Sequence, residues 1–292
     1  MKPVICKLGT IDFDLVETTP VVFRNRLYRF EYVRNRYKPN TTGDSYFRFV
    51  DVESGKYMPS FAASFHLGSA FVQDDVAHVF AVPSWGGDTI YHFQSADLAG
   101  WSKPEAALQE SGAQFYNTSV CHGRDGFVLS YERGEPVTPS HSRFALSLAE
   151  SADLRHWQPR TDLQPPVPLG CPTLRYSRGY YYLISGEGTY ETGIRQFISR
   201  SADLKKWAPS PYIVMDFSDE DRRIHGDFTS EQCSAIAHAV NINNSDLDLC
   251  EYQNKVIMYY SWGNQRGIEF LATASADGNL DDFLSSWFPA SE

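Results

Sequence analysis

Short apolar strands separated by tight polar turns dominate the hydrophobic pattern of the chain. An apolar strand, a turn and an aromatic-rich strand follow one another five times, at 20–30, 69–80, 119–129, 172–182 and 249–259. Asn, Asp and Gly occupy the turns, where they supply the left-handed conformations that hairpins require. No stretch keeps a 3.6-residue period over a helical length. The pattern therefore predicts an all-β protein built from hairpins.

A second motif follows these hairpins. Ser-Ala-Asp-Leu-x-x-Trp occurs at 95–101, 151–157 and 201–207, with a looser copy at 275–283 and a degenerate one at 50–57. Units of about fifty residues are typical of four-stranded propeller blades. The sequence predicts a single five-bladed β-propeller over 1–292, with four antiparallel strands per blade. The expected blades are 14–60, 61–106, 112–160, 166–210 and 240–292, with an insertion at 211–239. The N-terminal segment is expected to add a strand to the last blade, because closure removes a sheet edge.

The topology of a blade decides which loops carry chemistry. The innermost strand lines the axis and the next three step outward. The Ser-Ala-Asp-Leu turns join third and fourth strands, so we expect them on the face away from the inner-strand starts. Ser and Asp close such turns and Trp packs between blades, which gives the motif a structural role. The opposite face collects the inner-strand starts, the loops between second and third strands, and the crossovers.

Acidic residues on that face are candidates for catalysis. Asp246 and Asp248 begin the fifth inner strand, and the period of two puts both side chains on one side. Paired carboxylates raise one pKa, a route to a proton donor near neutral pH. We expect Asp246 to be the base or nucleophile and Glu17 to be a third acid. His225 or Glu187 is expected to donate the proton. In the plainer interpretation, Asp246 holds a turn, His225 makes a structural hydrogen bond and Glu187 is a solvated loop edge.

Aromatic and amide side chains of the same loops are candidates for sugar binding, because rings stack on sugar faces and amides bond hydroxyl groups. The expected set is Thr18, His66, Trp85, Asn117, Tyr190, Trp262, Asn264, Gln265 and Arg266. The loops also bring Arg34, Arg36, Glu132, Arg133 and Glu191 to this face. For His66 a structural hydrogen bond is the alternative, and for Trp85 and Trp262 it is packing between blades.

Composition narrows the classes of function. The 292-residue chain has 36 acidic residues, 26 Lys plus Arg and a net charge of −10, which argues against a nucleic acid or an anionic membrane as partner. Five cysteines, without a Cys-x-x-Cys pair, indicate reduced thiols in a cytoplasmic protein, or in a periplasmic or secreted one if a signal peptide has been removed. No metal or other cofactor is expected. The oligomeric state is left open.

The Ser-x-Asp-Leu-x-x-Trp turns, together with strands such as 179–183, resemble the five-bladed β-propeller glycoside hydrolases of families 43, 32 and 117 and the phosphorylases of family 130. Family 43 places an Asp at the start of the first and second inner strands and a Glu near the fourth. The corresponding stretches here are 17–20, 66–69 and 170–172, which do not match those carboxylates residue by residue. Family 117, with a histidine near its carboxylates, is the better analogy.

The residues and the resemblance together predict a glycoside hydrolase. Hydrolysis of a glycosidic bond needs an acid for the leaving oxygen and a base or nucleophile on the other side of the bond. Many loops crowd one face, which favours a pocket and an exo-acting enzyme on a short oligosaccharide. One alternative is a non-catalytic carbohydrate-binding propeller. A glycoside phosphorylase is the other, with Arg222, Arg223 and His225 as candidates for binding phosphate.

Overall fold

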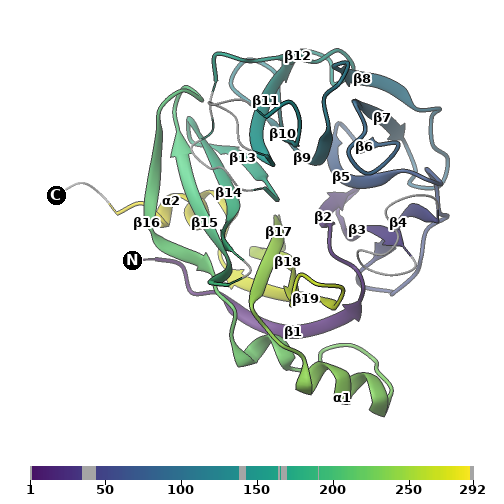
Figure 1. Ribbon diagram of the computed structural model, residues 1–292, viewed down its shortest axis with the longest axis vertical. Helices are drawn as coiled ribbons and strands as arrows, with labels where there is room; N and C mark the ends of the chain where they lie inside the picture. The colour runs from purple at the N-terminus through teal and green to yellow at the C-terminus, as the bar shows by residue number, and fades with distance from the viewer. Residues whose placement is uncertain are drawn as a thin grey trace.

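A computed structural model describes residues 2–34, 44–137, 143–163, 165, 170–189 and 191–289. Arg36 and Tyr190, which the sequence places at the site, lie outside these residues. The described chain consists mostly of strands, as the hairpin pattern predicts, and the strands surround a central axis (Figure 1). The fold is therefore built to bring loops from distant parts of the sequence to one place.

The strands form antiparallel groups that follow one another round the axis in chain order (Figure 1), and a parallel bridge between Ile194 and Asn243 joins the last two groups into one sheet. The first three groups are β2 (Thr18–Phe23), β3 (Arg26–Arg34) and β4 (Ser45–Asp51); β5 (His66–Gln73), β6 (Val76–Val82), β7 (Thr89–Ser95) and β8 (Glu105–Gln109); and β9 (Phe115–His122), β10 (Phe127–Arg133), β11 (Ala145–Ser151) and β12 (Gln158–Pro159). The next holds β13 (Thr173–Ser177), β14 (Tyr180–Thr189), β15 (Gly193–Ser201) and β16 (Trp207–Met215). The last holds β17 (Asn243–Tyr252), β18 (Lys255–Gly263), β19 (Glu269–Asp277) and the N-terminal β1 (Cys6–Phe13). Apolar side chains fill the space between groups, in one large cluster across the first three and another across the last two.

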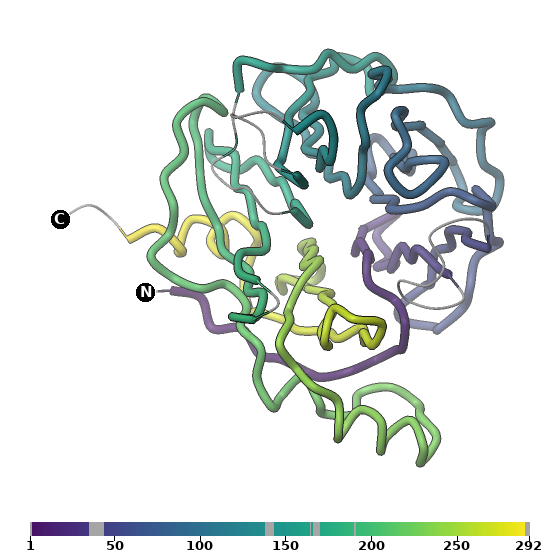
Figure 2. The backbone as a smooth tube through the Cα atoms, viewed as in Figure 1, coloured from purple at the N-terminus to yellow at the C-terminus, as the bar shows by residue number. Residues whose placement is uncertain are grey.

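The N-terminal strand β1 pairs antiparallel with β19, as expected for this segment, and Figure 2 shows the purple N-terminal segment running beside the yellow segment of β19. A buried polar network holds β1 in place. The Lys7 ammonium donates to Asp221 Oδ1 at 2.7 Å and to Asn244 Oδ1 at 2.8 Å, and Tyr260 donates to the same Asp221 oxygen at 2.7 Å. Burial lowers the pKa of Lys7, and the Asp221 carboxylate opposes that shift. The network ties the first strand to the insertion and to the last group.

Short helices are the feature that the hydrophobic pattern did not predict. They are a 3₁₀ helix over Asp219–Arg222, α1 (Ser230–His238) and α2 (Leu280–Ser286). The Thr229 side chain caps α1 by accepting from the Gln232 N–H, and Asn279 caps α2 in the same way. Each helix is at most nine residues long, too short for a 3.6-residue period to stand out. Polar caps therefore mark them better than hydrophobicity does.

The Ser-Ala-Asp-Leu turns have the structural role expected of them. In the turn at 95–101, the Ser95 hydroxyl accepts from the Leu98 N–H at 2.9 Å, and the Asp97 carboxylate accepts from two further N–H groups. Leu98 has a φ of 62°, and the two equivalent leucines have φ values of 64° and 61°. The same hydrogen bonds recur around Asp153 and Asp203. The motif therefore closes turns and takes no part in the site.

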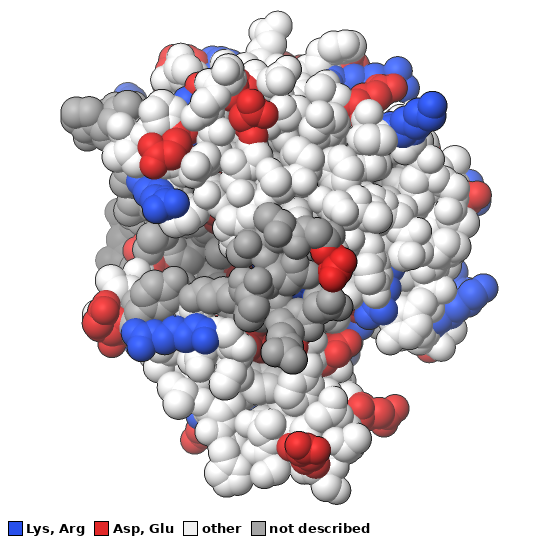
Figure 3. Space-filling model, turned by 45° about the vertical axis from the view of Figure 1, so that its right-hand side comes forward, with Lys and Arg blue, Asp and Glu red and all other residues white. Residues whose placement is uncertain are grey.

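The surface carries charges of both signs. Acidic and basic side chains are interspersed over the face shown in Figure 3. Among the described residues, no helix is long and apolar enough to cross a membrane.

A buried pair of histidines lies in the second group. His78 Nδ1 and His92 Nε2 share a hydrogen bond of 2.8 Å, their rings stack, and the side chains are 8% and 3% exposed. Burial lowers the pKa of each to about 4, with Arg155 adding to the effect. The folded protein therefore binds fewer protons than the unfolded chain between about pH 6.5 and pH 4. In this window the pair's contribution to stability falls as the pH falls.

We expect His92→Gln to remove part of the dependence of the protein's stability on pH. Between pH 7 and pH 4.5, the wild-type protein should lose more free energy of unfolding than the variant, by on the order of 3 kcal/mol. Urea unfolding at a series of pH values measures the difference. His122→Gln, at an exposed histidine, is the matched control and should keep the wild-type slope. Equal slopes for wild type and His92→Gln would contradict the prediction.

Candidate active site

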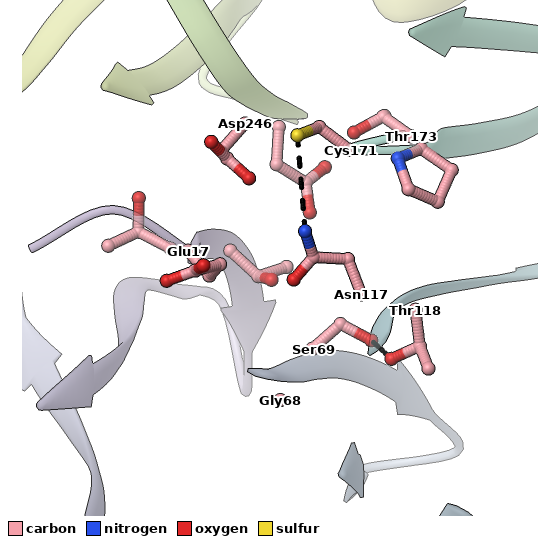
Figure 4. A pocket seen from close by; sticks show the side chains of 12 residues that line it. Glu17, Gly68, Ser69, Asn117, Thr118, Cys171, Thr173 and Asp246 are labelled. Atoms are coloured by element: carbon pink, nitrogen blue, oxygen red, sulfur yellow. Dashed lines mark hydrogen bonds between the residues drawn. The ribbon is translucent and has the colours of Figure 1, made fainter. Parts of the chain in front are cut away.

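A cavity of about 210 Å³ lies at the axis, where the inner strands begin. Every group of strands contributes to its wall. The lining residues are Val16, Glu17, Leu67, Trp85, Tyr116, Asn117, Glu132, Phe144, Gly170, Cys171, Gly186, Ile194, Ser245, Asp246 and Gln265. Below it, a narrow channel of about 30 Å³ continues along the axis, with room for about one water molecule. Figure 4 shows residues of this channel, with Glu17, Asn117, Cys171 and Asp246 turned toward one another.

Glu17 supplies the first of three carboxyl groups in the cavity. It directly precedes β2, and its side chain is 12% exposed. Burial raises the pKa of Glu17 to about 7; the Asp246 carboxylate adds to the shift, and the Arg34 guanidinium opposes it. Arg34, at the end of β3, lies 3.5 Å from Glu17 Oε2 and stacks on Trp85 at 5.3 Å. Glu17 is therefore a buried acid beside one fixed cation.

Glu132 supplies the second carboxyl group, near the end of β10, and is 5% exposed. Its Oε1 accepts from the main-chain N–H of Cys171 and from Asn117 Nδ2, the latter at 3.3 Å. Burial raises the pKa of Glu132 to about 8; the two hydrogen bonds lower it, and the Asp246 and Glu17 carboxylates raise it further. Glu132 therefore holds its proton at neutral pH.

Asp246 supplies the third carboxyl group from an irregular start of β17. The register between β17 and β18 shifts between Ser245 and Asp248, and Asp246 has a φ of 51°. Its Oδ2 accepts from Ser245 Oγ at 2.5 Å and from Ser261 Oγ at 3.3 Å. Burial raises the pKa of Asp246, and the hydrogen bonds from the two serine hydroxyls oppose the rise. The bulge thus aims a carboxyl group into the cavity.

Asp248 does not form the acid pair with Asp246 that the alternating pattern predicts. Both line the narrow channel, but Asp248 forms an ion pair with Arg175 and accepts from the Leu249 N–H at 2.7 Å. The carboxyl groups whose pKa Asp246 raises are Glu17 and Glu132, in other groups of strands. The period of two placed both aspartates on one side, and both do face the channel, but the charged partner of Asp248 is Arg175. The acid cluster is therefore assembled across groups rather than along one strand.

The proton donors predicted from the sequence lie elsewhere. The His225 N–H donates to the Thr10 carbonyl at 2.9 Å, so His225 sits against β1, the outermost strand of the last group, and it is exposed. Glu187 is exposed on β14, opposite Arg195, and does not line the cavity. The insertion that carries His225 runs along the outer edge of the last group of strands, because its main chain forms hydrogen bonds with Thr10 of β1. It therefore does not cross the axis.

The predicted binding residues divide into two sets. Trp85, Asn117 and Gln265 line the cavity, and Thr18 lines the narrow channel, where its buried hydroxyl has no partner. His66 instead is buried against the Tyr32 hydroxyl at 2.6 Å.

Three further predicted binding residues come from the end of β18 and its following loop, and they do not line the cavity. Trp262 is a core residue whose indole N–H donates to Thr10 Oγ1 at 2.8 Å. Asn264 closes its own turn by accepting from the Arg266 N–H at 2.8 Å, and Arg266 is exposed. The Trp262 side chain therefore packs in the core, and the Asn264 and Arg266 side chains belong to the loop. None of the three faces the axis.

Comparison with known proteins identifies the fold. No protein-family model and no curated protein matches the chain. A solved α-L-arabinofuranosidase, PaAbf62A from Podospora anserina, matches with a TM-score of 0.63 at 8% identity, over 95% of this chain and 98% of that one. A thermostable family-43 glycoside hydrolase matches with 0.61 at 10% identity, over 91% and 90%. A xylan β-1,4-xylosidase from Bacillus halodurans C-125 matches with 0.57 at 14% identity; the match covers 90% of this chain and 53% of that enzyme.

The chain has the fold of the β-propeller glycoside hydrolases. At these identities the likeness concerns the fold, and the chemistry has to be argued from the site itself.

Reasoning from the sequence gave too little weight to two residues of this site, Glu132 and Cys171. Glu132 was placed on the correct face but was not chosen as catalytic, although it and Arg133 are the charged residues of a strand that is buried over 128–131. Cys171 was expected at an inner-strand start on this face, but no role was assigned to it. Its φ of 59° and its contact with Glu132 depend on how the fourth group packs against the third, which no local pattern reveals.

Gly170 allows the Glu132 carboxyl to approach the backbone of the fourth group. A Cβ added at Gly170 would lie 1.7 Å from Glu132 Oε1 and 2.3 Å from its carboxyl carbon. Gly170→Ala should therefore displace Glu132 and lower the activity of the protein by at least tenfold. Gly112→Ala, at an open position with nothing within 4 Å, is the control for adding a methyl group. Because Gly112 has a φ of 79°, an alanine at this position strains the backbone, and thermal unfolding measures the resulting loss of stability. Full activity in Gly170→Ala would show that the close contact does not matter.

Proposed function

We propose that this protein is a five-bladed β-propeller glycoside hydrolase that removes a terminal sugar from a short oligosaccharide. The observation that carries the proposal is the cluster of Glu17, Glu132 and Asp246, carboxyl groups from three groups of strands around one cavity, of which Glu132 is buried and the other two are largely buried. Burying several acids together is costly, so such clusters gather at functional sites. Glycoside hydrolysis is the chemistry that needs two carboxyl groups in different protonation states.

The environments of the three groups suggest their roles. Burial raises the pKa of Glu132 to about 8, so it is protonated at neutral pH and suits the general acid that protonates the leaving oxygen. Asp246 accepts hydrogen bonds from the Ser245 and Ser261 hydroxyls, which favour its ionised form, so it suits the base or nucleophile. Glu17 and Arg34 then orient the sugar and set the local charge. Water supplies the hydroxyl group at the anomeric carbon of the released sugar. One proton of that water passes to Asp246 if Asp246 is the base, or to Glu132, which has given up its own proton, if Asp246 is the nucleophile.

The shape and lining of the cavity support exo-action. At about 210 Å³, the cavity is below the range of about 300–1,000 Å³ that holds drug-sized ligands, so it suits one sugar ring. An aromatic wall stands on one side, with Tyr116 between Trp85 and Phe144 at centroid distances of 6.3 and 5.0 Å. Such a wall supports the apolar face of a sugar, while Asn117 and Gln265 reach its hydroxyl groups.

Phosphorolysis has less support than hydrolysis. Its proposed phosphate ligands face the outer edge: Arg222 pairs with Asp219, Arg223 pairs with Glu220, and neither lines the cavity. Beside the cavity, the Arg34 guanidinium forms an ion pair with Glu17. The three carboxyl groups that line the cavity disfavour a phosphate dianion and favour an uncharged sugar.

Assays with and without phosphate test the proposal. Chromogenic aryl glycosides and a panel of plant and algal oligosaccharides are incubated with wild type and with Glu132→Gln. The proposal expects one monosaccharide to be released in the absence of phosphate. Turnover only with phosphate would identify a phosphorylase. Binding of a sugar by both proteins, with no turnover by either, would identify a carbohydrate-binding propeller.

A further inference from the structure

A further buried acid, Glu269, lies in the same group of strands as Asp246. It is the first residue of β19, and its side chain is 0% exposed. Both carboxylate oxygens accept hydrogen bonds: the main-chain N–H of Gln265 donates to Oε1, and Asn243 Nδ2 donates to Oε2 at 3.1 Å. Glu269 therefore fixes the Gln265 loop and turns the donor side of the Asn243 amide toward itself, because a carboxylate accepts hydrogen bonds.

The side-chain amides of these two residues meet at the Ser245 hydroxyl. Asn243 Nδ2 and Gln265 Nε2 each donate to Ser245 Oγ at 3.1 Å. A hydroxyl group has two lone pairs and one proton, so after accepting two hydrogen bonds it has only its proton to give. The acceptor for that proton is Asp246 Oδ2, 2.5 Å away. Ser261 Oγ, 2.8 Å from Ser245 Oγ, also donates to Asp246 Oδ2, at 3.3 Å.

The direction of these hydrogen bonds favours the ionised form of Asp246. A carboxylate at this position accepts the Ser245 proton, whereas a protonated Oδ2 would find both lone pairs of the Ser245 hydroxyl already used. Asn243, Ser245 and Ser261 are at most 1% exposed, so bulk water does not compete for these contacts. Burial raises the pKa of Asp246, and the Ser245 hydrogen bond opposes that rise.

We propose that Ser245 and Gln265 are positioning residues of the site: Gln265 orients the Ser245 hydroxyl, and this hydroxyl holds Asp246 as the ionised base or nucleophile. The catalytic meaning of this proposal rests on the proposed function, whereas the hydrogen bonds themselves do not depend on it. Gln265 also lines the cavity. One side chain thus serves both the cavity that receives the sugar and the carboxylate that acts on it.

Two uncharged substitutions separate the steps of this path. Ser245→Ala removes the donor to Asp246. Gln265→Met keeps the length of the side chain and the main-chain N–H to Glu269, but it removes the amide donor and frees one lone pair of Ser245. Neither variant changes a charge around Asp246, where Figure 4 shows Glu17 and Cys171 beside it. The charged and titratable groups around Asp246 are Glu17, Arg34, Glu132, Cys171 and Asp248.

The experiment is a carboxyl ¹³C NMR titration of the wild type, both single variants and the double variant, with the Asp246 signal assigned by its loss in Asp246→Asn. We expect the Asp246 midpoint to rise by about one pH unit in Ser245→Ala and by about half a pH unit in Gln265→Met. The double variant should have the same midpoint as Ser245→Ala, because Gln265 acts on Asp246 only through Ser245. Ser130→Ala, which removes a buried hydroxyl from β10, is the control and should keep the wild-type midpoint.

Two results would overturn the proposal. One is an unchanged Asp246 midpoint in Gln265→Met. The other is a double variant in which the two shifts add, which would mean that Gln265 acts on Asp246 directly. If Ser245→Ala does not fold, because two amides lose their acceptor, Gln265→Met still decides the question at a partly exposed position.

The kinetics of the same variants connect the path to catalysis. In the wild-type enzyme the acidic limb of the kcat/KM profile should follow the Asp246 midpoint, and it should move to higher pH in Gln265→Met. Loss of a contact with the sugar alone would raise KM at every pH and leave the limb in place, which would contradict the positioning role. If the wild type hydrolyses no glycoside, the proposed function fails, whereas the titration still decides whether Gln265 acts on Asp246 through Ser245.

Discussion

Replacing Asp246 with Asn should lower kcat by at least about a hundredfold while the protein stays folded. Asn has almost the size of Asp, and it can accept from Ser245 and Ser261 with its amide oxygen, so the bulge at this position survives. It cannot act as a base or as a nucleophile. The loss should therefore be similar for every glycoside, whether its leaving group is good or poor, because each needs attack at the anomeric carbon. Initial rates with a series of aryl glycosides measure this.

Asp248→Asn is the control for Asp246→Asn. Asp248 lies two residues further along β17, but its carboxylate is paired with Arg175 below the cavity. Asp248→Asn should lower the free energy of unfolding, because it leaves the Arg175 guanidinium without a negative charge beside it. It should alter kcat much less than Asp246→Asn does. If Asp246→Asn keeps most of the wild-type activity, or loses it only because it unfolds early, Asp246 holds the turn and does not take part in the reaction.

Glu132→Gln should lose activity in a way that depends on the leaving group. As the proton donor, Glu132 is needed most when the departing oxygen is a poor leaving group, as in a natural oligosaccharide. We expect a loss of roughly 10²–10⁴-fold there and a much smaller loss with a dinitrophenyl glycoside, whose phenolate departs without a proton. Comparing the two substrates in one variant separates an acid from a residue that only shapes the cavity. Equal losses on both substrates would remove Glu132 from the role of acid.

The same variant should be more stable than the wild type at neutral pH. Burial raises the pKa of Glu132 to about 8, so the folded state binds more protons than the unfolded chain between about pH 4.5 and pH 8. The contribution of Glu132 to stability therefore falls as the pH rises through that window, at a cost on the order of 3 kcal/mol by pH 7. Gln carries no charge to bury. Thermal unfolding at pH 5 and pH 8 should show a gain for Glu132→Gln that is larger at pH 8.

Much of the fold was predictable because it repeats. Each hairpin carries its own turn residues and each Ser-Ala-Asp-Leu turn its own hydrogen bonds, so local chemistry repeated along the chain reveals the architecture. The pairing of β1 with β19 followed from the need to cover a sheet edge. The insertion was different. Its path along β1 depends on main-chain hydrogen bonds with Thr10 and on the buried network around Lys7 and Asp221, and none of these residues stands out in the sequence.

The site was harder to predict than the fold. Glu17 and Asp246 were found because acids at inner-strand starts must face the axis. Asp248 was misjudged because it forms an ion pair with Arg175 from the preceding group of strands, and such a pairing leaves no mark in a single sequence. His225 was placed over the axis on the length of its loop alone, which says how far a segment reaches but not in which direction. The importance of Glu132 and Cys171 arises from packing between groups of strands that are adjacent in space.

The pairing of β1 with β19 also has a consequence for synthesis of the protein. Residues 6–13 are made well before their partner strand, residues 269–277. At about 5–20 residues per second, β1 waits for tens of seconds without its partner. During that interval the groups between them can form their own hairpins, and the Lys7 side chain gains Asp221 and Asn244 only late. The last group is thus completed only after the other four have been made, and until then the nascent chain carries an unpaired strand.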